Sequence, residues 1–363
     1  MQAAVCYEFG KPLVVEEVDI APPKHGEVKV RLAATAICHS DVHLVRGDWG
    51  DWGGLPPIVA GHEAAGLVEE IGEGVTLTKP GDAAVVSLLR SCGRCFFCVT
   101  GSPYMCEGKF ALASESRLRN RRGRALRQGI KTAAFAEYVI VDQSQVVPIP
   151  TDMPLDRASL LACGVITGLG AVVNTAQVKP GSSLVVIGTG GVGLNSIQGA
   201  VLAGAYPIIA LDILEAKLAA ARNFGATHTI DPRQPGSVQM VKDLTSGRGA
   251  DYVFVTVGSP AAVTQGLGLI RRGGTVVIVG MPPPEARAPI PISDFANDGH
   301  RLIGSNMGST RLRVDVPRLV EMYQRGRLKL DELITARYPL EQINQAIESM
   351  ERGEALRNVI VFP

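Results

Sequence analysis

The sequence lacks any run of about 18 apolar residues, so it predicts no membrane-spanning helix. It also lacks an excess of charge of either sign, with 36 Lys and Arg against 35 Asp and Glu. Bulk nucleic-acid binding needs a basic excess to neutralise phosphates, so we expect no nucleic-acid partner. The first residues, MQAAVCYEFGKP, have neither the basic nor the apolar region of a signal peptide, so we expect a cytoplasmic protein.

Cysteine is well represented, with seven residues in a chain of 363. In a reducing compartment these are more often metal ligands or free thiols than disulfides. The length is comfortable for two domains.

Four of the cysteines are clustered as Cys92, Cys95, Cys98 and Cys106. Two residues between successive cysteines let one tight turn aim several thiolates at one point, and the fourth closes a tetrahedron. The spacing favours a closed structural zinc site. An iron–sulfur cluster is the rival, but the gap after Cys98 is too long for the bacterial ferredoxin pattern and no proline follows Cys106.

A second group of chemically active side chains lies between residues 38 and 63. Cys38 and His62 can supply two ligands to a zinc ion, which keeps an open position when the site is catalytic. A third ligand must come from elsewhere, and Cys163, in the glycine-rich and apolar segment LACG, is the candidate.

The pattern changes near residue 165 to alternating strands and helices. Strands are expected at 183–187, 207–211, 252–257 and 275–279, with helices between them. The first strand is a continuous β-branched run, as expected of a strand buried on both faces. This alternation predicts an α/β fold with a doubly wound parallel sheet.

A glycine-rich turn joins the first of these strands to a helix. Gly188 allows the tight turn, Gly190 lets the backbone approach a pyrophosphate, and Gly193 lets helix and strand pack closely. Asp212 ends the second strand, where its carboxylate can bind the adenosine ribose and would repel a 2′-phosphate. No arginine directly follows it, so we expect NAD rather than NADP.

These motifs, in this order over essentially the whole chain, resemble the zinc-dependent alcohol dehydrogenases of the medium-chain dehydrogenase/reductase superfamily. The resemblance implies a mainly β, GroES-like catalytic domain formed from both chain ends, with a Rossmann domain inserted. The expected boundaries are 1–165 for the catalytic domain with its zinc lobe at 91–107, 166–304 for the NAD domain, and 305–363 for the return to the catalytic domain.

The resemblance also implies roles for individual residues, with two zinc ions per subunit. Cys38, His62 and Cys163 would hold the catalytic zinc, Asp41 would orient the ligand imidazole, Glu63 would lie behind the metal, and Ser40 and His43 would form a proton relay. The implied cofactor contacts are His39, Thr167, Gly188, Gly190, Gly191, Val192, Gly193, Asp212, Lys217, Val257, Val279 and Arg357. The implied substrate pocket comprises Leu88, Ile130, Met281 and Met307, with Trp49 or Trp52 added.

Three features depart from the family pattern or stay open. Many relatives carry Arg where His39 stands, and a neutral imidazole should bind the pyrophosphate more weakly and in a pH-dependent way. Trp49 and Trp52 share one Gly- and Pro-rich loop, which they either anchor or extend into the pocket. Residues 117–127 hold six arginines, which are expected to form a solvated loop or else to capture an acidic group.

The leading hypothesis is therefore hydride transfer between NAD and a primary or secondary, hydrophobic alcohol, by a homodimer with a tetramer as the alternative. A second hypothesis is a formaldehyde dehydrogenase that depends on a thiol such as glutathione or mycothiol. A third is a zinc- and NAD-binding protein without enzymatic activity.

Overall fold

The computed structural model describes residues 1–363 except for the side chains of residues 51 and 52, so the candidate pocket residue Trp52 lies outside the described residues. The chain divides into two compact units, one of residues 1–163 with 311–363 and one of residues 164–310. The boundaries expected from the sequence lie at 165 and 304.

The second unit is built on a six-stranded parallel sheet. Its strand order is β13(His228–Ile230), β12(Ile208–Leu211), β11(Leu184–Ile187), β14(Ala250–Val255), β15(Ile270–Ile278) and β16(Arg301–Gly304). The strand order reverses beside β11, which is the switch point at which such sheets bind ligands. The predicted doubly wound sheet is confirmed.

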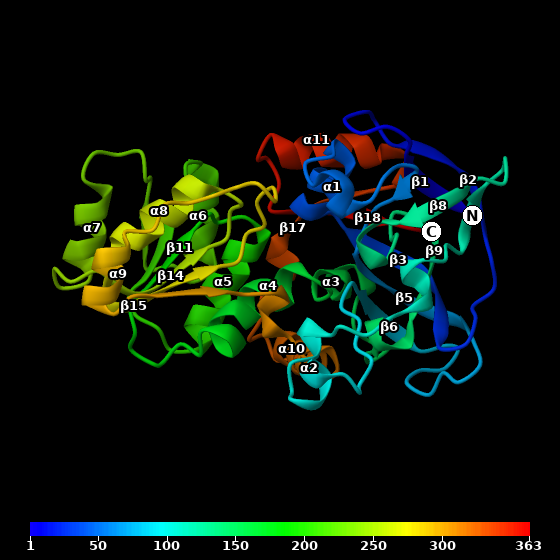
Figure 1. Ribbon diagram of the computed structural model, residues 1–363, viewed down its shortest axis with the longest axis horizontal. Coiled ribbons are helices and arrows are strands. Elements are labelled where there is room, and N and C mark those ends of the chain that lie inside the picture. The colour runs from blue at the N-terminus through cyan, green and yellow to red at the C-terminus, as the bar shows by residue number, and fades with distance from the viewer. The chain divides into compact units, whose positions relative to one another are not determined.

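Helices alternate with these strands, shown in green to orange in Figure 1. They are α4(Gly164–Gly170), α5(Gly191–Leu202), α6(Glu215–Asn223), α7(Ser237–Leu244), α8(Pro260–Leu269) and α9(Ile292–Asp298), with a π-helix η6(Ala171–Thr175) and a 3₁₀ turn η7(Met307–Ser309). Apolar side chains of the strands pack with those of α7 and α8 in one core cluster, which includes Val185, Val253, Val263 and Leu267.

The first unit is mainly β. Its larger sheet has the order β10(Val146–Pro148), β6(Ala83–Ser87), β5(Glu63–Ile71), β3(Glu27–Ala36), β18(Arg357–Val361) and β17(Ile334–Tyr338), with β9(Tyr138–Asp142) also on β3. β18 pairs antiparallel with β3, with Ile360 opposite Thr35. Because β18 lies at the C-terminus and β3 near the N-terminus, both chain ends form this unit, as predicted.

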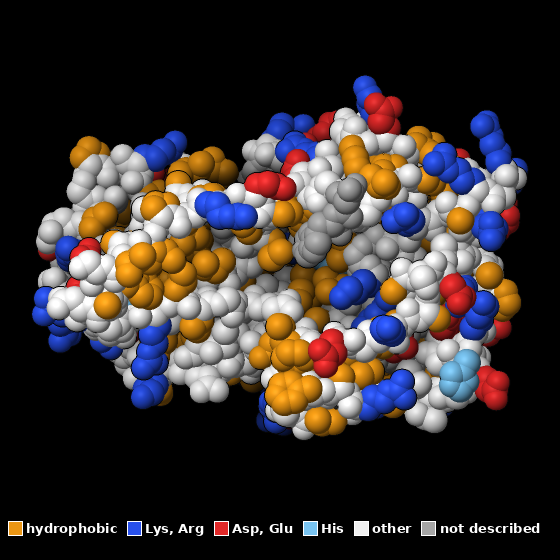
Figure 2. Space-filling view, viewed as in Figure 1, with side chains coloured by type: hydrophobic (Ala, Val, Ile, Leu, Met, Phe, Trp, Pro, Cys, Tyr) orange, Lys and Arg blue, Asp and Glu red, His pale blue; other side chains and the backbone are white. Residues whose placement is uncertain are grey.

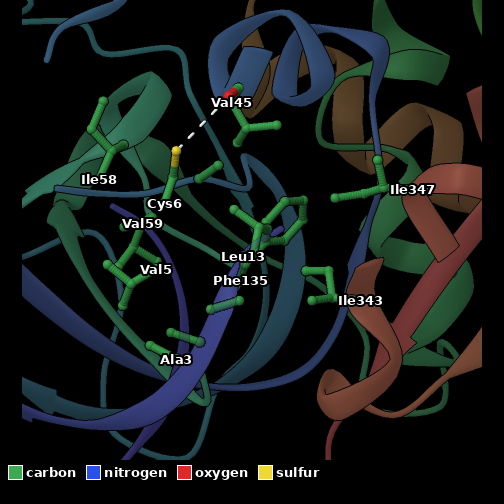
Figure 3. Packing of buried hydrophobic residues seen from close by; sticks show 14 of the residues in the cluster. Ala3, Val5, Cys6, Leu13, Val45, Ile58, Val59, Phe135, Ile343 and Ile347 are labelled. Carbon is green, nitrogen blue, oxygen red and sulfur yellow. Dashed lines mark hydrogen bonds between the residues drawn. The ribbon is translucent and has the colours of Figure 1, made fainter. Parts of the chain in front are cut away.

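A small closed barrel completes the first unit, with the order β1(Gln2–Cys6), β2(Val14–Ile20), β7(Leu118–Asn120), β8(Ala125–Gln128) and β4(Ile58–Val59). Its core packs Val5, Ile58 and Phe135 against Ile343 and Ile347 (Figure 3). The helices are α1(His39–Arg46), α2(Phe96–Val99), α3(Leu155–Leu160), α10(Leu312–Gln324) and α11(Ile343–Glu351). The 3₁₀ turns are η1(Gly50–Gly53), η2(Pro103–Met105), η3(Ala111–Ala113), η4(Gly129–Lys131), η5(Gln143–Gln145), η8(Asp331–Leu333) and η9(Leu340–Gln342).

The arginine-rich segment is a β-hairpin, not the solvated loop that its charge predicted. β7 and β8 pair antiparallel, and Gly123 takes the left-handed conformation, with a φ of +77°, in the connecting turn. Arg117 is buried, and its guanidinium forms a two-point ion pair with Glu27 at 2.9 and 2.5 Å. The charge pattern missed this because β2, which pairs with β7, is distant in sequence.

The four-cysteine lobe around α2 exposes apolar side chains. Phe96 and Val99 are each 67% exposed and Met105 is 43% exposed. Figure 2 shows hydrophobic side chains gathered over this helix, at the lower centre. No helix of the described chain has both the length and the apolar character needed to cross a membrane.

Candidate functional site

Asp41 joins the two segments that carry the first two predicted ligands. Cys38 is the N-cap of α1, and the Asp41 carboxylate, three residues on, accepts a hydrogen bond of 3.1 Å from the Cys38 backbone N–H. Its other oxygen accepts from the Gly61 N–H at 2.9 Å and from His62 Nδ1 at 3.0 Å. Asp41 and His62 are fully buried, so this carboxylate fixes the imidazole ring and its tautomer.

The arrangement at His62 fits a metal ion. With Nδ1 donating to Asp41, Nε2 presents its lone pair, and this buried atom has no hydrogen-bond partner within the described part of the chain. The ligand atoms of Cys38, His62, Glu63 and Cys163 all lie within 4.8 Å of one another, and all four residues are buried. Two sulfurs and one nitrogen are ligands that zinc prefers, so the residues fit the group that the sequence predicted.

The charges of this cluster depend on one another. A hydrogen bond with the Cys163 thiol, and then the neighbouring His62, lower the pKa of Cys38 well below its ordinary value. Burial opposes a charge on His62, but the Asp41 carboxylate more than offsets it, so the pKa of His62 is raised. A metal ion would displace the Nε2 proton when it binds, because only the neutral imidazole is a ligand. Cys38 therefore favours the thiolate form that binds metal.

Behind the cluster, Glu63 forms a buried ion pair with Arg357. Burial raises the pKa of Glu63 to about 7, although the Arg357 charge acts in the opposite direction. Arg357 is 5% exposed, so the residue expected to contact a cofactor phosphate instead directs its guanidinium to this carboxylate. Its predicted contact with the cofactor stays a prediction.

Cys163 is held by a contact that the sequence gave no means of finding. The hydroxyl of Ser87, at the end of β6, donates to the Ala162 carbonyl at 2.6 Å, and both residues are fully buried. Because Ala162 precedes Cys163, this bond fixes the backbone that carries the third sulfur.

Ser40 and His43 lie three residues apart on α1 and so share one face of the helix. His43 Nδ1 lies 2.7 Å from an Asp48 carboxylate oxygen, and the His43 side chain is 30% exposed. The ring of Trp49 lies 5.8 Å from that of His43, and Trp49, only 7% exposed, belongs to the core cluster of the barrel. Trp49 thus anchors its loop, and a pocket role for it stays a prediction.

The four clustered cysteines meet as their spacing predicts, with all four sulfurs within 4.8 Å of one another. Backbone N–H groups donate hydrogen bonds to one of these sulfurs. The N–H of Cys92 lies 3.2 Å from the Cys106 sulfur, and the N–H of Gly108 lies 3.3 Å from the same sulfur. Backbone hydrogen bonds lower the pKa of Cys95 to about 6. A Cβ at Gly108 would lie 2.7 Å from the Cys92 Cβ, so glycine is needed there.

In the second unit, the glycine turn has the geometry that its motif demands. Gly188 has a φ of +89°, and a Cβ on Gly193 would lie 1.9 Å from the Gly188 carbonyl oxygen. Around Gly190, by contrast, a Cβ would meet nothing within 4 Å. α5 begins at Gly191 and runs for 12 residues, so its first N–H groups and the open space at Gly190 fit a pyrophosphate.

Asp212 follows β12 and already binds this turn. One oxygen accepts from the Thr189 N–H at 2.7 Å and the other from the Leu214 N–H at 3.1 Å. The Thr189 hydroxyl also donates to the carboxylate, at 3.1 Å. A carboxylate has about four acceptor sites, so about one remains for a ribose hydroxyl. Lys217 lies in the first half of α6 and is partly exposed.

The other predicted residues are distributed over both units. In the second unit, Thr167 and Val279 are 8% and 7% exposed, Val257 and Met281 are 38% and 49% exposed, and the Thr167 hydroxyl lies 3.6 Å from the Met307 sulfur. Val192 is partly exposed in the first turn of α5. In the first unit, Leu88 and Ile130 are partly buried and His39 is exposed at the start of α1.

Comparison with known families matches two regions of the chain. Residues 24–151 match the alcohol dehydrogenase GroES-like domain, and residues 191–325 match the zinc-binding dehydrogenase family.

Individual relatives cover nearly the whole chain. Alcohol dehydrogenase 1 of Pisum sativum is 36% identical over 99% of this chain and 96% of its own length. A putative alcohol dehydrogenase D of Mycobacterium tuberculosis is 38% identical over 99% of both chains.

Solved structures of dehydrogenases also match nearly the whole chain. The benzyl alcohol dehydrogenase of Acinetobacter calcoaceticus is 31% identical over 100% of this chain and 99% of its own, with a TM-score of 0.92. A putative zinc-binding dehydrogenase of Sinorhizobium meliloti, bound to NADP, is 28% identical over 99% of both chains, with a TM-score of 0.83. The hypothesis of a protein without enzymatic activity is therefore dropped. With its buried cysteine–histidine cluster, its four-cysteine lobe and its glycine turn, the chain belongs to the zinc-dependent alcohol dehydrogenases of the medium-chain dehydrogenase/reductase superfamily.

Proposed function

We propose that the chain transfers hydride between NAD and a hydrophobic primary or secondary alcohol, with one catalytic and one structural zinc ion per subunit. The observation that carries the proposal is the buried His62 Nε2, directed by Asp41 and accompanied by the sulfurs of Cys38 and Cys163.

Cys38, His62 and Cys163 would hold the catalytic zinc, which when bound supplies the Lewis acidity that favours loss of the alcohol proton. Asp41 keeps the His62 proton on Nδ1, so that Nε2 stays available. Cys92, Cys95, Cys98 and Cys106 would hold the structural ion, whose closed ligand set leaves no position for substrate.

Ser40 and His43 would move the alcohol proton to solvent. Their hydroxyl and imidazole share one face of α1, and Asp48 accepts from His43 Nδ1. His43 can therefore take a proton at Nε2, and its partly exposed ring can pass that proton to water.

Preference for NAD is supported by Asp212. Its carboxylate would accept from a ribose hydroxyl and repel a 2′-phosphate, and Ile213 and Leu214 follow it instead of an arginine. The glycine turn and the start of α5 would bind the pyrophosphate, with His39 as a further contact. NAD, when bound, accepts the hydride.

The proposal of a hydrophobic alcohol rests on the family resemblance, which implies substrate contacts from the apolar residues Leu88, Ile130, Met281 and Met307. The benzyl alcohol dehydrogenase among the similar structures makes benzyl alcohol a suitable first probe.

The direct test follows NADH absorbance with a panel of alcohols, and the reverse reaction with aldehydes and ketones. We expect turnover with benzyl alcohol and a kcat/KM with NAD at least about tenfold above that with NADP, a difference of about 1.4 kcal/mol. A preference for NADP would refute the role given to Asp212. Formaldehyde oxidation that requires added glutathione or mycothiol would instead favour the thiol-dependent alternative.

A cytoplasmic homodimer remains part of the proposal. The segment between Cys106 and Phe135 resembles that of longer family members that are often dimers. Light scattering should give twice the subunit mass of 38.4 kDa, and four times that mass would favour a tetramer.

A further inference from the structure

Arg90 is a buried arginine without an ion pair to any described residue, and the function proposed above gives it no role. It follows β6, is 7% exposed, and lies two residues before the first cysteine of the zinc lobe. A buried charge is expensive unless its hydrogen bonds are satisfied, so the partners of Arg90 indicate what it does.

The guanidinium of Arg90 has two hydrogen-bond partners and one ring contact. Its Nε donates to the side-chain oxygen of Gln145 at 2.7 Å, and its Nη2 donates to the backbone carbonyl of Lys131 at 2.8 Å. The Gln145 amide, itself fully buried, also reaches the Lys131 carbonyl, at 3.2 Å. Arg90 lies 5.7 Å from the centre of the Phe110 ring. Two buried side chains thus hold one backbone carbonyl.

That carbonyl belongs to a strained loop. Ile130, Lys131 and Ala133 have φ values of +46°, +62° and +63°, in the left-handed region that non-glycine residues seldom adopt. A β-branched residue such as Ile130 is least suited to it. Such a backbone conformation is unfavourable for a residue with a side chain and persists only where its surroundings enforce it. The double hydrogen bond to the Lys131 carbonyl is such an enforcement.

The loop packs against both segments that lead to the catalytic cluster. A Cβ on Gly129 would lie 2.7 Å from the Val59 carbonyl oxygen and 2.8 Å from a methyl group of Leu44 on α1. Just beyond the loop, the Ala134 N–H donates to the Gly61 carbonyl at 2.9 Å. Gly61 precedes His62, so the conformation of the loop and the position of the ligand segment are linked.

We propose that Arg90 is a positioning residue for the alcohol pocket: with Gln145, it fixes the Lys131 carbonyl and thereby sets the position of the Ile130 side chain. The inference rests on the proposed function, since it takes Ile130 as part of that pocket. Arg90 touches no reacting atom and acts on substrate selection through the loop.

The test compares Arg90→Met with the wild type, using benzyl alcohol and ethanol as substrates. We expect KM for benzyl alcohol to rise about tenfold and kcat to change less than about threefold. The ratio of kcat/KM for benzyl alcohol to that for ethanol should fall, because a displaced Ile130 alters contacts that only the larger alcohol makes. Arg122→Met, which removes an exposed arginine of the β7–β8 turn, is the matched control and should behave as wild type.

Two further variants separate positioning from simple stability. Arg90→Lys can still donate to the Lys131 carbonyl, so its KM for benzyl alcohol should lie between those of the wild type and Arg90→Met. If Arg90→Met does not fold, Arg90→Lys is compared with the wild type in its place. Arg90→Met combined with Lys131→Asn should recover part of the lost selectivity, because asparagine tolerates the left-handed conformation better than lysine.

Amide hydrogen exchange gives a readout independent of turnover. The N–H groups of Thr132 and Ala133 donate to the Gly129 carbonyl at 3.1 and 3.2 Å, and both should exchange faster in Arg90→Met. Unchanged exchange and unchanged selectivity in a folded variant would overturn the inference and leave the proposed function intact. If the wild-type protein oxidised neither benzyl alcohol nor ethanol, the proposed function would fail, and the inference about Arg90 that rests on it would fail as well.

Discussion

The two candidate metal centres of the first unit are built in opposite ways. The four-cysteine lobe draws its candidate ligands from 15 consecutive residues, 92–106, and all four are partly buried. The other centre draws Cys38, His62 and Cys163 from three distant parts of the chain, and all three are buried.

The difference shows which structure each centre requires. The lobe needs one turn, with backbone N–H groups and Gly108 close to its sulfurs. The buried centre needs the whole unit: Asp41 links two ligand segments and Ser87 fixes the third. We therefore expect loss of the lobe to affect stability first, and loss of the buried centre to affect turnover first.

The largest effect should come from Cys38→Ser. Removing a ligand of the proposed catalytic zinc should lower kcat/KM by more than about 100-fold, which exceeds the usual effect of losing a residue that only supports a ligand. The protein should stay folded and lose one zinc per chain. Cys6→Ser, which changes a buried thiol outside both centres, should keep its zinc and its activity. Full alcohol oxidation by Cys38→Ser would show that the buried centre is not catalytic.

Asp41→Asn should have the next largest effect. The amide keeps the size of the carboxylate but removes the charge that orients His62, which should lower zinc affinity or activity by about 10- to 100-fold. Competition with a zinc chelator measures the affinity. Asp48→Asn alters a carboxylate of the same helix region that bonds His43 but no predicted ligand, so it should leave zinc affinity unchanged.

Cys106→Ser should act mainly on stability. The lobe would lose its zinc, and because metal binding contributes to folding, the melting temperature should fall. The activity that remains at low temperature should exceed that of Cys38→Ser, as compared by calorimetry and NADH absorbance on the same samples. Equal loss of activity in both variants would mean that the two centres are not functionally distinct.

The smallest predicted effect is on stability, and it concerns Asp156, which belongs to neither candidate metal centre. Burial alone would raise the pKa of Asp156, but its hydrogen bonds to Arg157 and Arg337 outweigh burial, so the pKa lies below its ordinary value. A lowered carboxyl pKa adds stability above the unfolded-state pKa, and that stability is lost as the pH falls through the folded-state pKa.

Asp156→Asn should therefore lower the free energy of unfolding at pH 7 by up to about 1 kcal/mol, since the site is partly exposed. Denaturant titrations at pH 7 and below pH 3 check the sign, because the difference from wild type should shrink in acid. A difference that grew in acid would contradict it.

Sequence reasoning succeeded where the signal is local. The cysteine spacing, the glycine turn with Asp212 and the β-branched run before it each carry their geometry within a few residues, and the structure has the corresponding elements. The structure also brings together Cys38, His62 and Cys163, the three predicted ligands of the buried centre. Cys163 was proposed from its glycine-rich, apolar segment, and the family resemblance then implied the same role for it.

What the sequence could not give depends on contacts between distant segments. The Arg117–Glu27 pair needs residues 90 positions apart, and the Glu63–Arg357 pair needs residues 294 positions apart. The left-handed positions of the loop are occupied by Ile130, Lys131 and Ala133. None of them is the glycine or asparagine by which such a conformation can be predicted from sequence. Only the folded barrel and sheet bring Arg90 and Gln145 to that loop.

The central claim is most directly tested by counting zinc in the purified wild-type protein by elemental analysis, with Cys38→Ser and Cys106→Ser measured beside it. The account predicts two zinc ions per chain in the wild type and one in each variant. One zinc in the wild type, lost from Cys106→Ser and kept in Cys38→Ser, would contradict it.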